Sequence, residues 1–432
     1  MLPELSPTLI RRRLTSLFPV DLVEGIARER DAVQRHRTID ITMLVWSLIL
    51  GFAVDGETRS IAAFQRAYQT ATNQTVARSS FYDRFTPELR DLLSDLLAHA
   101  LEEVAVPHTI APQLTQFRDT MIADATVFRL HRLLTTFPAT HEDQSGAQLY
   151  LVYNVTRQTL AQFKLTDERT HESSQFRTGN WLRGRLFLFD LGFYSYRRFA
   201  LIDENDGFFV SRLKTNANPR IVGERRKWRG RAISLTGTRL QDRLSKLTRE
   251  HIDVTGEFEF KRRKYGERQS QAIVEFRVVG VRNEDTDDYH LYVTNLPDEF
   301  TPEQVAVLYS LRWKVELLFR ELKSRYGLEK FETGDEAIAE LLVTAALLTL
   351  VVSRALLAVF QEIEPDVEYP EERWATTFRS VAQPVLADLG LALGHPPPNL
   401  PELVRREARQ PERSRLTLNK RVAQAFKTEV WP

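Results

Sequence analysis

The spacing of apolar positions changes once along the chain, near residue 117. Before that point the apolar residues form runs of helical length and spacing, so we predict a helical region over residues 1–110. We expect its last helix to be single or a pair, capped by Ser79 or Ser80. The expected helices are Ile41–Phe52, Ile61–Tyr68 and Phe81–Leu101. The first is too short to cross a bilayer, which takes roughly 20 residues, and should be buried.

After residue 117 the apolar runs become short and rich in β-branched or aromatic residues, with polar or turn-forming stretches between them. This pattern predicts a helix at Tyr194–Ile202 among several strands. The strands are Met121–Leu130, Leu149–Thr156, Thr159–Leu165, Leu186–Leu191 and Gly207–Leu213. Residues 214–288 are polar and highly charged, with expected strands only at Glu257–Phe260 and Ala272–Val281. We therefore interpret 214–288 as an insertion, after which strand character returns at His290–Asn295.

The next predicted element is a helix with a well-marked beginning. Thr301 can cap a helix whose first residue is Pro302, and Gln304 completes a capping box. We expect this helix to continue to about Ser324. It would close a region of strands and helices that covers residues 117–335.

The remaining part, residues 336–432, is also expected to be helical. Leu341–Val352 is apolar over too short a span to cross a membrane, and it predicts a buried helix. From Ile363 onward the chain is rich in proline and its last part is basic, which predicts a loosely packed helical appendage. This region is a candidate for a dimer contact.

Composition narrows the chemistry that the chain can perform. Hydrophobic residues make up 43% of the 432 residues, enough to fill a core. Cysteine is absent, which excludes disulfides and thiolate metal sites and leaves carboxylates, histidines and backbone oxygens as ligands. No Gly-rich phosphate loop is present, and His131, His141 and His171 lack metal-ligand spacing. Because 59 Lys and Arg residues balance 58 Asp and Glu residues, nucleic-acid binding would depend on local basic patches.

Two aspartates occupy positions where a strand would otherwise be apolar. Asp124 lies within Met121–Phe128, and Asp190 ends the apolar run that begins at Leu186. An ionised carboxylate in a buried strand is costly unless a positive group compensates it. Two such acids on central strands can converge on one cation. The alternative is that each aspartate caps a neighbouring loop or helix, as aspartate often does at strand ends.

The helix after Thr301 carries a third acid in a polar stripe. Four polar residues lie within an arc of roughly 60° at about 100° per residue; they are Tyr309, Arg312, Glu316 and Lys323. The apolar residues cluster on a separate face, which can pack on a sheet. A carboxylate for a metal, with two cations and a phenol for phosphate oxygens, suits phosphodiester chemistry. The alternative is an ordinary amphipathic helix with an Arg312–Glu316 ion pair.

These residues resemble the signature of DDE transposases of the insertion-sequence-4 family. Tyr309-x2-Arg312-x3-Glu316-x6-Lys323 matches the Tyr-Arg-Glu-Lys pattern of that family in residue and spacing. Asp124-Ala-Thr126 resembles the family's first-acid strand, and Leu188-Phe-Asp190-Leu-Gly-Phe-Tyr194 resembles its second. The resemblance covers residues 117–335 well and the helical region before them more loosely.

The resemblance implies a fold and a reaction. The fold would be α/β, a ribonuclease-H-like mixed sheet flanked by helices, with an inserted, mostly β region at 214–288 and a helical amino-terminal domain. The reaction would be cleavage at transposon ends and strand transfer into target DNA, commonly through a hairpin intermediate. Tyr309, Arg312 and Lys323 would hold phosphates near the cut end. The catalytic residues and the ligands of two Mg²⁺ or Mn²⁺ ions would be Asp124, Asp190 and Glu316.

The implied partners are DNA and a second copy of the chain. The DNA would be the terminal inverted repeats and the target, read in part by the amino-terminal helices, and the chain would act as a homodimer in the synaptic complex. Met1–Leu17 has charges and prolines where a signal peptide needs an apolar run. We therefore expect a cytoplasmic, nucleoid-associated protein without membrane contact.

Further basic and aromatic positions are candidates for DNA contact. Arg212 and Lys214 end the strand after the second acid and are expected to contact the DNA backbone. Basic runs would neutralise phosphates or form solvated segments; they are Arg11–Arg13, Arg220–Arg231 and Lys261–Lys264. Relatives are expected to stack a flipped base on an aromatic residue of the insertion. The candidates are Trp228, Tyr289 and Tyr292, each equally well explained by packing.

Two other functions fit the same pattern. One is a DNA-binding relative that has lost activity, and the other is a ribonuclease-H-fold nuclease that cleaves without joining. The complete set of three acids argues against the first. Strand-transfer products would exclude the second.

Overall fold

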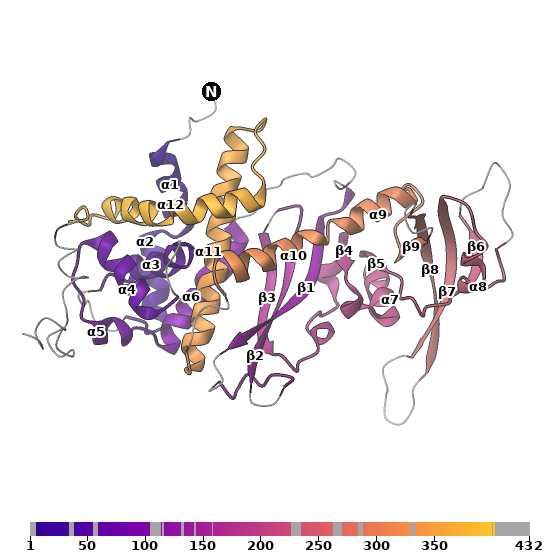
Figure 1. Cartoon of the computed structure of the whole chain (residues 1–432), viewed down its shortest axis with the longest axis horizontal. Coiled ribbons are helices and arrows are strands. Elements are labelled where there is room, and N and C mark those ends of the chain that lie inside the picture. The colour runs from indigo at the N-terminus through magenta and orange to yellow at the C-terminus, as the bar shows by residue number, and fades with distance from the viewer. Residues whose placement is uncertain are drawn as a thin grey trace, which may run out of the picture.

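The computed structural model has helices at one end, a mixed sheet in the centre and a strand-rich extension at the other end (Figure 1). The central sheet is crossed on one face by the helices that follow it in sequence. The residues that the structure describes are 6–33, 39–54, 59–103, 114, 116–130, 134–141, 144–157, 159–225, 235–261, 270–283, 288–328, 333–399 and 401.

Six helices form the amino-terminal part of the molecule. They are α1 (Pro7–Leu17), α2 (Val20–Glu29), α3 (Ile41–Ala53), α4 (Ile61–Thr72), α5 (Arg78–Tyr82) and α6 (Pro87–Glu103). The buried helix expected from the apolar run at 41–52 is confirmed, because α3 is buried from Thr42 to Ala53. The expected helix over 81–101 is a pair, α5 and α6. The cap prediction was wrong: Ser79 and Ser80 lie inside α5, and Ala77 is its N-cap.

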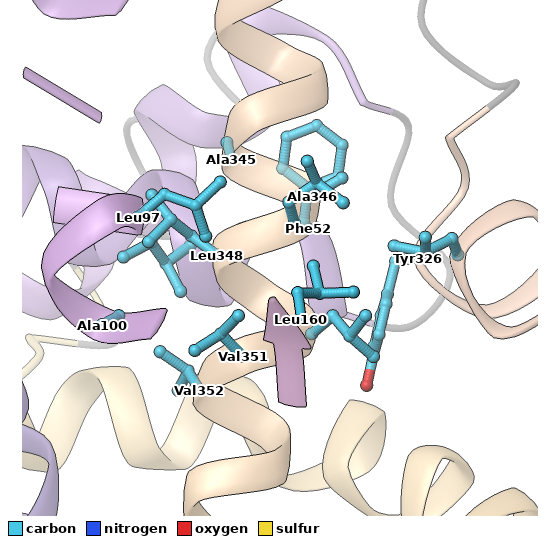
Figure 2. Close-up of a cluster of buried hydrophobic side chains, with 14 of the residues drawn as sticks. Phe52, Leu97, Ala100, Leu160, Tyr326, Ala345, Ala346, Leu348, Val351 and Val352 are labelled. Atoms are coloured by element: carbon cyan, nitrogen blue, oxygen red, sulfur yellow. The ribbon is translucent and has the colours of Figure 1, made fainter. Parts of the chain in front are cut away.

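Two later helices pack among these six. α11 (Glu336–Ile363) lies against α6 and α3, and α12 (Glu371–Ala392) lies against α3 and α4. The Thr349 hydroxyl of α11 donates to the Ile49 carbonyl oxygen of α3 at 2.6 Å. Figure 2 shows the apolar side chains that meet around α11, among them Phe52, Leu97, Leu160, Ala346 and Leu348. Helices α1 to α6 therefore share one core with α11 and α12.

α11 is long and apolar enough to cross a membrane by length and composition alone. However, 89% of its most apolar 18-residue window is buried inside the protein. Such burial is typical of the central helix of a folded domain. The predicted buried helix at Leu341–Val352 is thus confirmed, although it is longer than expected.

The expectation of a loosely packed appendage after Ile363 was wrong for α12. Trp374, Leu386 and Leu389 of this helix are buried in the shared core. Proline in the preceding segment ends α11 but does not prevent α12 from packing, because its apolar face is covered by α3 and α4. The basic segment at the end of the chain lies outside the described residues.

Nine strands form one mixed sheet in the order β3-β2-β1-β4-β5-β9-β8-β7-β6. Their bounds are β1 Asp119–Leu130, β2 Ser145–Asn154, β3 Thr159–Asp167, β4 Arg185–Phe189, β5 Phe208–Arg212, β6 Arg220–Glu224, β7 His251–Lys261, β8 Gln271–Arg282 and β9 Tyr289–Thr294. β1 is parallel to β4 and β4 is parallel to β5, whereas all other pairs are antiparallel. Every predicted strand is present. The region 214–288 contributes β6, β7, β8 and the short α8 (Gln241–Leu244) to the same sheet or its edge.

The two faces of the central strands belong to different cores. Ile122 and Leu188 face the core shared with α11, whereas Ala123 and Phe189 face a second, aromatic-rich core that includes α7 (Tyr196–Glu204). Successive side chains of a strand point to opposite faces. Asp124 therefore lies on the first face, together with Ile122. The helices that follow β9 cover this same face (Figure 1).

The helix after β9 is interrupted, which corrects the prediction of a single helix to about Ser324. α9 (Pro302–Ser310) has the predicted capping box, α10 covers Trp313–Arg320, and a π-helical turn covers Glu321–Arg325. Between α9 and α10 the backbone makes i→i+3 hydrogen bonds, including Arg312 N–H to the Tyr309 carbonyl oxygen at 3.0 Å. The spacing of apolar residues did not reveal either irregularity, because one tightened and one widened turn change that spacing very little.

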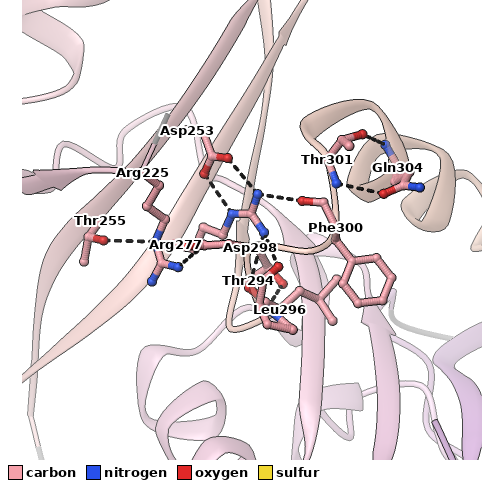
Figure 3. Close-up of polar contacts among 11 residues, drawn as sticks. Arg225, Asp253, Thr255, Arg277, Thr294, Leu296, Asp298, Phe300, Thr301 and Gln304 are labelled. Atoms are coloured by element: carbon pink, nitrogen blue, oxygen red, sulfur yellow. Dashed lines mark hydrogen bonds and ion pairs between the residues drawn. The ribbon is translucent and has the colours of Figure 1, made fainter. Parts of the chain in front are cut away.

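A buried ion pair fastens the start of α9 to β7 and β8 (Figure 3). Arg277 of β8 is 1% exposed and donates to both carboxylate oxygens of Asp253 of β7, at 2.8 and 2.7 Å. The same guanidinium donates to three backbone carbonyl oxygens just before α9; they belong to Leu296, Pro297 and Phe300. These bonds offset the cost of burying the charge. β7 and β8 thereby fix where α9 begins.

Gly390→Ala is expected to lower the free energy of unfolding by about 1–3 kcal/mol. A Cβ at this position of α12 would overlap the Ala71 carbonyl oxygen of α4, so the two helices would have to separate. Thermal or urea unfolding measures the change. The matched control is Gly25→Ala in α2, where a Cβ meets nothing within 4 Å, and it should stabilise by about 0.5–1 kcal/mol. Equal effects at the two positions would contradict the close contact between α4 and α12.

Candidate active site

Asp124 and Asp190 lie side by side on neighbouring parallel strands. β1 and β4 are paired in register up to Ala123 and Phe189, so the next residue along each strand places Asp124 beside Asp190. Paired residues of a parallel ladder project from the same face. The two carboxylates are close enough for the charge of Asp190 to raise the pKa of Asp124. Strand pairing thus brings together two acids that are distant in the sequence.

The Asp124 carboxylate is poorly solvated, with 13% of its side chain exposed. Burial is the main cause that raises the pKa of Asp124 from 3.8 to about 7, and the charges of Asp190 and Glu172 act in the same direction. The Ala125 N–H, which donates to Asp124 at 2.8 Å, and the Arg312 charge oppose that shift. A cation at this position would favour the ionised carboxylate.

A fourth acid, Glu172, lies beside this pair and was not predicted. It begins the 3-10 turn Glu172–Ser174, and burial together with the charge of Asp190 raises its pKa. Gly192, in the turn after Asp190, permits the approach, because a Cβ there would overlap the Glu172 Oε1 atom. The only signal in the sequence is an acid in a polar segment after β3, which is also typical of a solvated loop.

Arg198 braces the turn that follows Asp190. This arginine of α7 donates to the carbonyl oxygen of Ser173 at 2.5 Å and to that of Phe193. Its guanidinium carbon lies 5.7 Å from the ring centroids of both Phe176 and Phe193. Burial lowers the pKa of Arg198, yet arginine remains charged at neutral pH. Arg198 therefore joins the turn after the second aspartate to the turn that carries Glu172.

Arg312 lies between Asp124 and Glu316. Its Nη2 donates to Glu316 Oε1 at 2.5 Å, and its Nη1 lies 3.6 Å from Asp124 Oδ2. The Arg312 side chain is only 16% exposed, which strengthens both interactions relative to a surface ion pair. Glu316 thus faces the aspartates across a shared guanidinium instead of touching them.

Tyr309 and Arg312 both carry buried polar atoms with no hydrogen-bond partner of normal geometry among the described residues. These atoms are the Tyr309 hydroxyl and the Arg312 Nε. The Tyr309 ring packs on Tyr292, with 5.3 Å between ring centroids, and burial raises the pKa of Tyr309 to about 12. Tyr309 is therefore neutral at physiological pH. Unpartnered buried polar atoms are uncommon and suit a site that receives a polar ligand.

Three other predicted cations lie around the acids. The Lys323 Nζ donates to the Val127 carbonyl oxygen of β1 at 2.5 Å, three residues beyond Asp124. Arg212 is exposed at the end of β5, close enough for its charge to lower the pKa of Tyr309. The Lys214 Nζ lies 5.0 Å from the ring centroid of Tyr194, shortly after Asp190. Lys323 thus lies near Asp124 and Arg212 near Tyr309, whereas Lys214 contacts Tyr194, which packs against the second core.

Two of the three aromatic candidates for base stacking make packing or hydrogen-bonding contacts of their own in the structure. Tyr292 is buried against Tyr309, and the Tyr289 hydroxyl donates to the Arg249 carbonyl oxygen. Trp228 lies outside the described residues, as do most of the two basic runs around 226–231 and 262–264. In the amino-terminal basic run, Arg11 belongs to α1 and is paired with Asp388 at 2.7 Å.

The donor set suits a hard divalent cation, although its ligands are not yet assembled. Across the described ranges, no group of three or more acidic or histidine side chains is already placed to hold a metal ion. Asp124 and Asp190 would supply oxygen ligands, and a cation would relieve the desolvated, like-charged surroundings of Asp124. Glu316 would have to exchange the guanidinium of Arg312 for such a cation.

Comparison with known proteins gives consistent matches. Residues 115–352, more than half of the chain, match the family described as Transposase DDE domain. The transposase for insertion sequence element IS231F of Bacillus thuringiensis is 23% identical over 389 residues, covering 76% of this chain and 75% of the relative. The putative transposase InsL for insertion sequence element IS186A of Escherichia coli is 34% identical over 95 residues, 22% and 24% of the two chains. A piggyBac transposase synaptic complex with hairpin DNA aligns over 99% of this chain and 90% of that one, but its TM-score of 0.48 and 10% identity are too low to establish a common fold.

The chain therefore belongs to the Transposase DDE domain family. It is a DNA transposase, related to those of insertion sequences. As an enzyme of this class it acts on DNA, and DDE transposases generally use divalent metal ions. Its architecture is a large mixed sheet flanked by helices.

Asp124→Asn is expected to stabilise the metal-free protein at high pH. The pKa of Asp124 in the folded chain is about 7, above its ordinary value of 3.8. Folding therefore favours the protonated form, and stability is lost as the pH rises from about 4 to about 7. Asparagine keeps the shape of the aspartate side chain but carries no charge. In EDTA the melting temperature of the variant should exceed that of the wild type at about pH 8, with a gain that shrinks steadily toward about pH 5. A gain that does not vary with pH would show that the carboxylate is not strained by burial.

Proposed function

We propose that this transposase belongs to the insertion-sequence-4 group and uses Asp124, Asp190 and Glu316 as its catalytic acids. The observation that carries the proposal is the meeting of three segments around Arg312: the middle of β1, the end of β4 and the start of α10. The Tyr-Arg-Glu-Lys spacing over residues 309–323 supports the assignment to that group. Fold alone would not define the activity, which depends on the side chains of this site.

A ribonuclease-H-like core over residues 117–335 is part of the proposal. It is supported by the strand order β3-β2-β1-β4-β5, in which β1, β2 and β3 are antiparallel while β4 and β5 run parallel to β1. The region 214–288 would then be the family's insertion. The helices of residues 1–110 are proposed to read DNA. Residues 336–432, whose helices α11 and α12 pack against them, would support that unit and provide the dimer contact.

The three acids are proposed to hold two Mg²⁺ or Mn²⁺ ions. Bound there, the ions would supply activation of a water or of a DNA 3′-hydroxyl and stabilisation of the leaving oxygen. The chain's own contribution is to present Asp124 and Asp190 from rigid strands. When DNA enters, Glu316 turns from the guanidinium of Arg312 toward the aspartates, and Arg312 becomes available to a phosphate. The unpartnered Arg312 Nε and Tyr309 hydroxyl support a polar ligand at that position.

Lys323, Arg212 and Lys214 are proposed to hold the DNA backbone beside the acids. Their positions around β1, the end of β5 and the turn after Asp190 support this role. The DNA substrates would be the terminal inverted repeats of the element and a target duplex. Because two ends must be cut and joined, the chain is proposed to act as a homodimer, in the cytoplasm and on the nucleoid.

Glu316→Gln should abolish cleavage and leave DNA binding intact. Glutamine keeps the shape and the hydrogen bond to Arg312 but removes the charge that a divalent cation requires. The measurement uses a duplex that carries the terminal inverted repeat from the DNA flanking the gene, with Mg²⁺ or Mn²⁺. Nicked, hairpin and strand-transfer products are separated on denaturing gels, and binding is followed by fluorescence anisotropy.

Glu372→Gln is the matched control, since Glu372 is 63% exposed and pairs only at the surface with Arg320. It should cleave and join at the wild-type rate. Normal cleavage by Glu316→Gln would remove Glu316 from the site. Cleavage by the wild type without any joined product would instead identify a nuclease.

Arg312→Ala should lower both the affinity for the DNA end and the cleavage rate. The variant loses a phosphate contact and leaves the Asp124 carboxylate without its nearest cation. We expect the slope of log affinity against log salt concentration to fall by about 1. A titration from low to high salt measures this slope. An unchanged slope together with an unchanged cleavage rate would argue against Arg312 as a phosphate contact.

A further inference from the structure

The helix that carries Glu316 ends in a π-helical turn, Glu321–Arg325. Its wider hydrogen bonding is visible in the Tyr326 N–H, which donates to the Glu321 carbonyl oxygen at 3.0 Å. A π turn has i→i+5 hydrogen bonds in place of i→i+4, so the side chains within it point in other directions than in a regular α-helix. Glu316 lies before this turn and Lys323 lies within it. The turn therefore sets the angle between these two side chains.

A buried cluster of charges surrounds the π turn. Glu321 is 6% exposed and accepts hydrogen bonds from Arg354 Nη2 at 2.5 Å and from the Tyr326 hydroxyl at 2.7 Å. Arg354 belongs to α11 and also lies 3.3 Å from Glu371 of α12. Glu371 in turn accepts from Lys314 of α10 at 3.1 Å. The cluster thus joins the catalytic helix to both carboxy-terminal helices.

The backbone at the end of the turn is held as well. Arg59, which is 4% exposed, donates from Nε to the Tyr326 carbonyl oxygen at 3.0 Å. The Tyr326 ring is fully buried and enters the apolar cluster around α11 (Figure 2). A buried arginine of α11 thus holds the first residue of the widened turn, and a buried arginine between α3 and α4 holds the backbone just after it.

Stability alone does not account for the Arg354–Glu321 pair. Arg354 is 5% exposed, and its Nε and Nη1 atoms are buried without a hydrogen-bond partner among the described residues. Removing such charges from water is costly, and apolar residues of similar volume often serve a core equally well. A directional ion pair, unlike an apolar contact, fixes the orientation of the groups that it joins. The pair is suited to hold a helix in an irregular register.

We propose that the Arg354–Glu321 ion pair is a positioning device that keeps the π turn in place and so sets where Glu316 and Lys323 stand at the DNA. The inference rests on the proposed roles of Glu316 and Lys323. Neither Arg354 nor Glu321 reaches the proposed acid site, so both act through the helix. The turn acts most directly on Lys323, because it directs the Lys323 Nζ to the Val127 carbonyl oxygen of β1.

The test compares single and double neutral variants of the full-length protein. Arg354→Met leaves Glu321 buried without its counter-charge and should lower both the melting temperature and the cleavage rate. In Glu321→Gln with Arg354→Met no such unpaired charge remains, and Glu371 keeps Lys314 as its partner. We expect the double variant to regain melting temperature. Its kcat for cleaving the terminal-repeat duplex should stay about 10-fold to 100-fold low, with KM within about 3-fold of wild type.

The matched control makes the same two changes at a surface pair between α10 and α12. Arg320 and Glu372 are 56% and 63% exposed and lie 3.3 Å apart. The double variant Arg320→Met with Glu372→Gln should cleave at the wild-type kcat. A second variant, Arg354→Lys, keeps the charge but loses the planar guanidinium, and should fold with a reduced kcat.

Recovery of kcat together with melting temperature in the Glu321→Gln, Arg354→Met chain would overturn the inference. A wild-type kcat for Arg354→Lys would also overturn the inference. This variant provides the test if the double variant fails to fold. The proposed function is tested separately. If Glu316→Gln is inactive while the Glu321 and Arg354 variants are fully active, only the positioning inference fails. If Glu316→Gln cleaves normally, the proposed catalytic acids are wrong.

Discussion

The parallel pairing of β1 with β4 is the constraint on which the site depends. It puts two carboxylates next to each other on one face of the sheet, where they repel and where water is largely excluded. Such an arrangement is unfavourable by itself. It is tolerated because Arg312 supplies a positive charge from the facing helix, and that same charge brings Glu316 to the pair. In this site the acids are neutralised by Arg312. A divalent cation could replace Arg312 beside the acids, and a phosphate could replace the acids beside Arg312.

The helix that completes this balance is fastened at both ends by parts of the chain outside the central strands. At its start, Arg277 of β8 binds the backbone that leads into α9. At its other end, Arg354 of α11 binds Glu321 beyond α10. Between them the chain departs from regular α-helix twice, once in a tightened turn and once in a widened one. These departures are held by tertiary contacts and not by local preference.

Local signals predicted the elements of the fold well. The strands followed from short runs of β-branched and aromatic residues, and the start of α9 followed from Thr301 and Gln304. The sequence could not predict the features that depend on distant partners. Glu172 reaches the aspartates only because Gly192 leaves room, and α12 packs tightly only because α3 and α4 cover its apolar face. The catalytic roles of the three acids stay predictions, because the structure describes their positions and only the variants test their chemistry.

The shared core of α3, α6 and α11 has a consequence for synthesis of the protein. The ribosome completes α3 and α6 long before α11 emerges, and chains grow at about 5–20 residues per second. During that interval the apolar surface of α3, which α11 later covers, has no permanent partner. A nascent or prematurely terminated chain would expose this surface to chaperones and proteases, so the enzyme matures only when its last helices leave the ribosome.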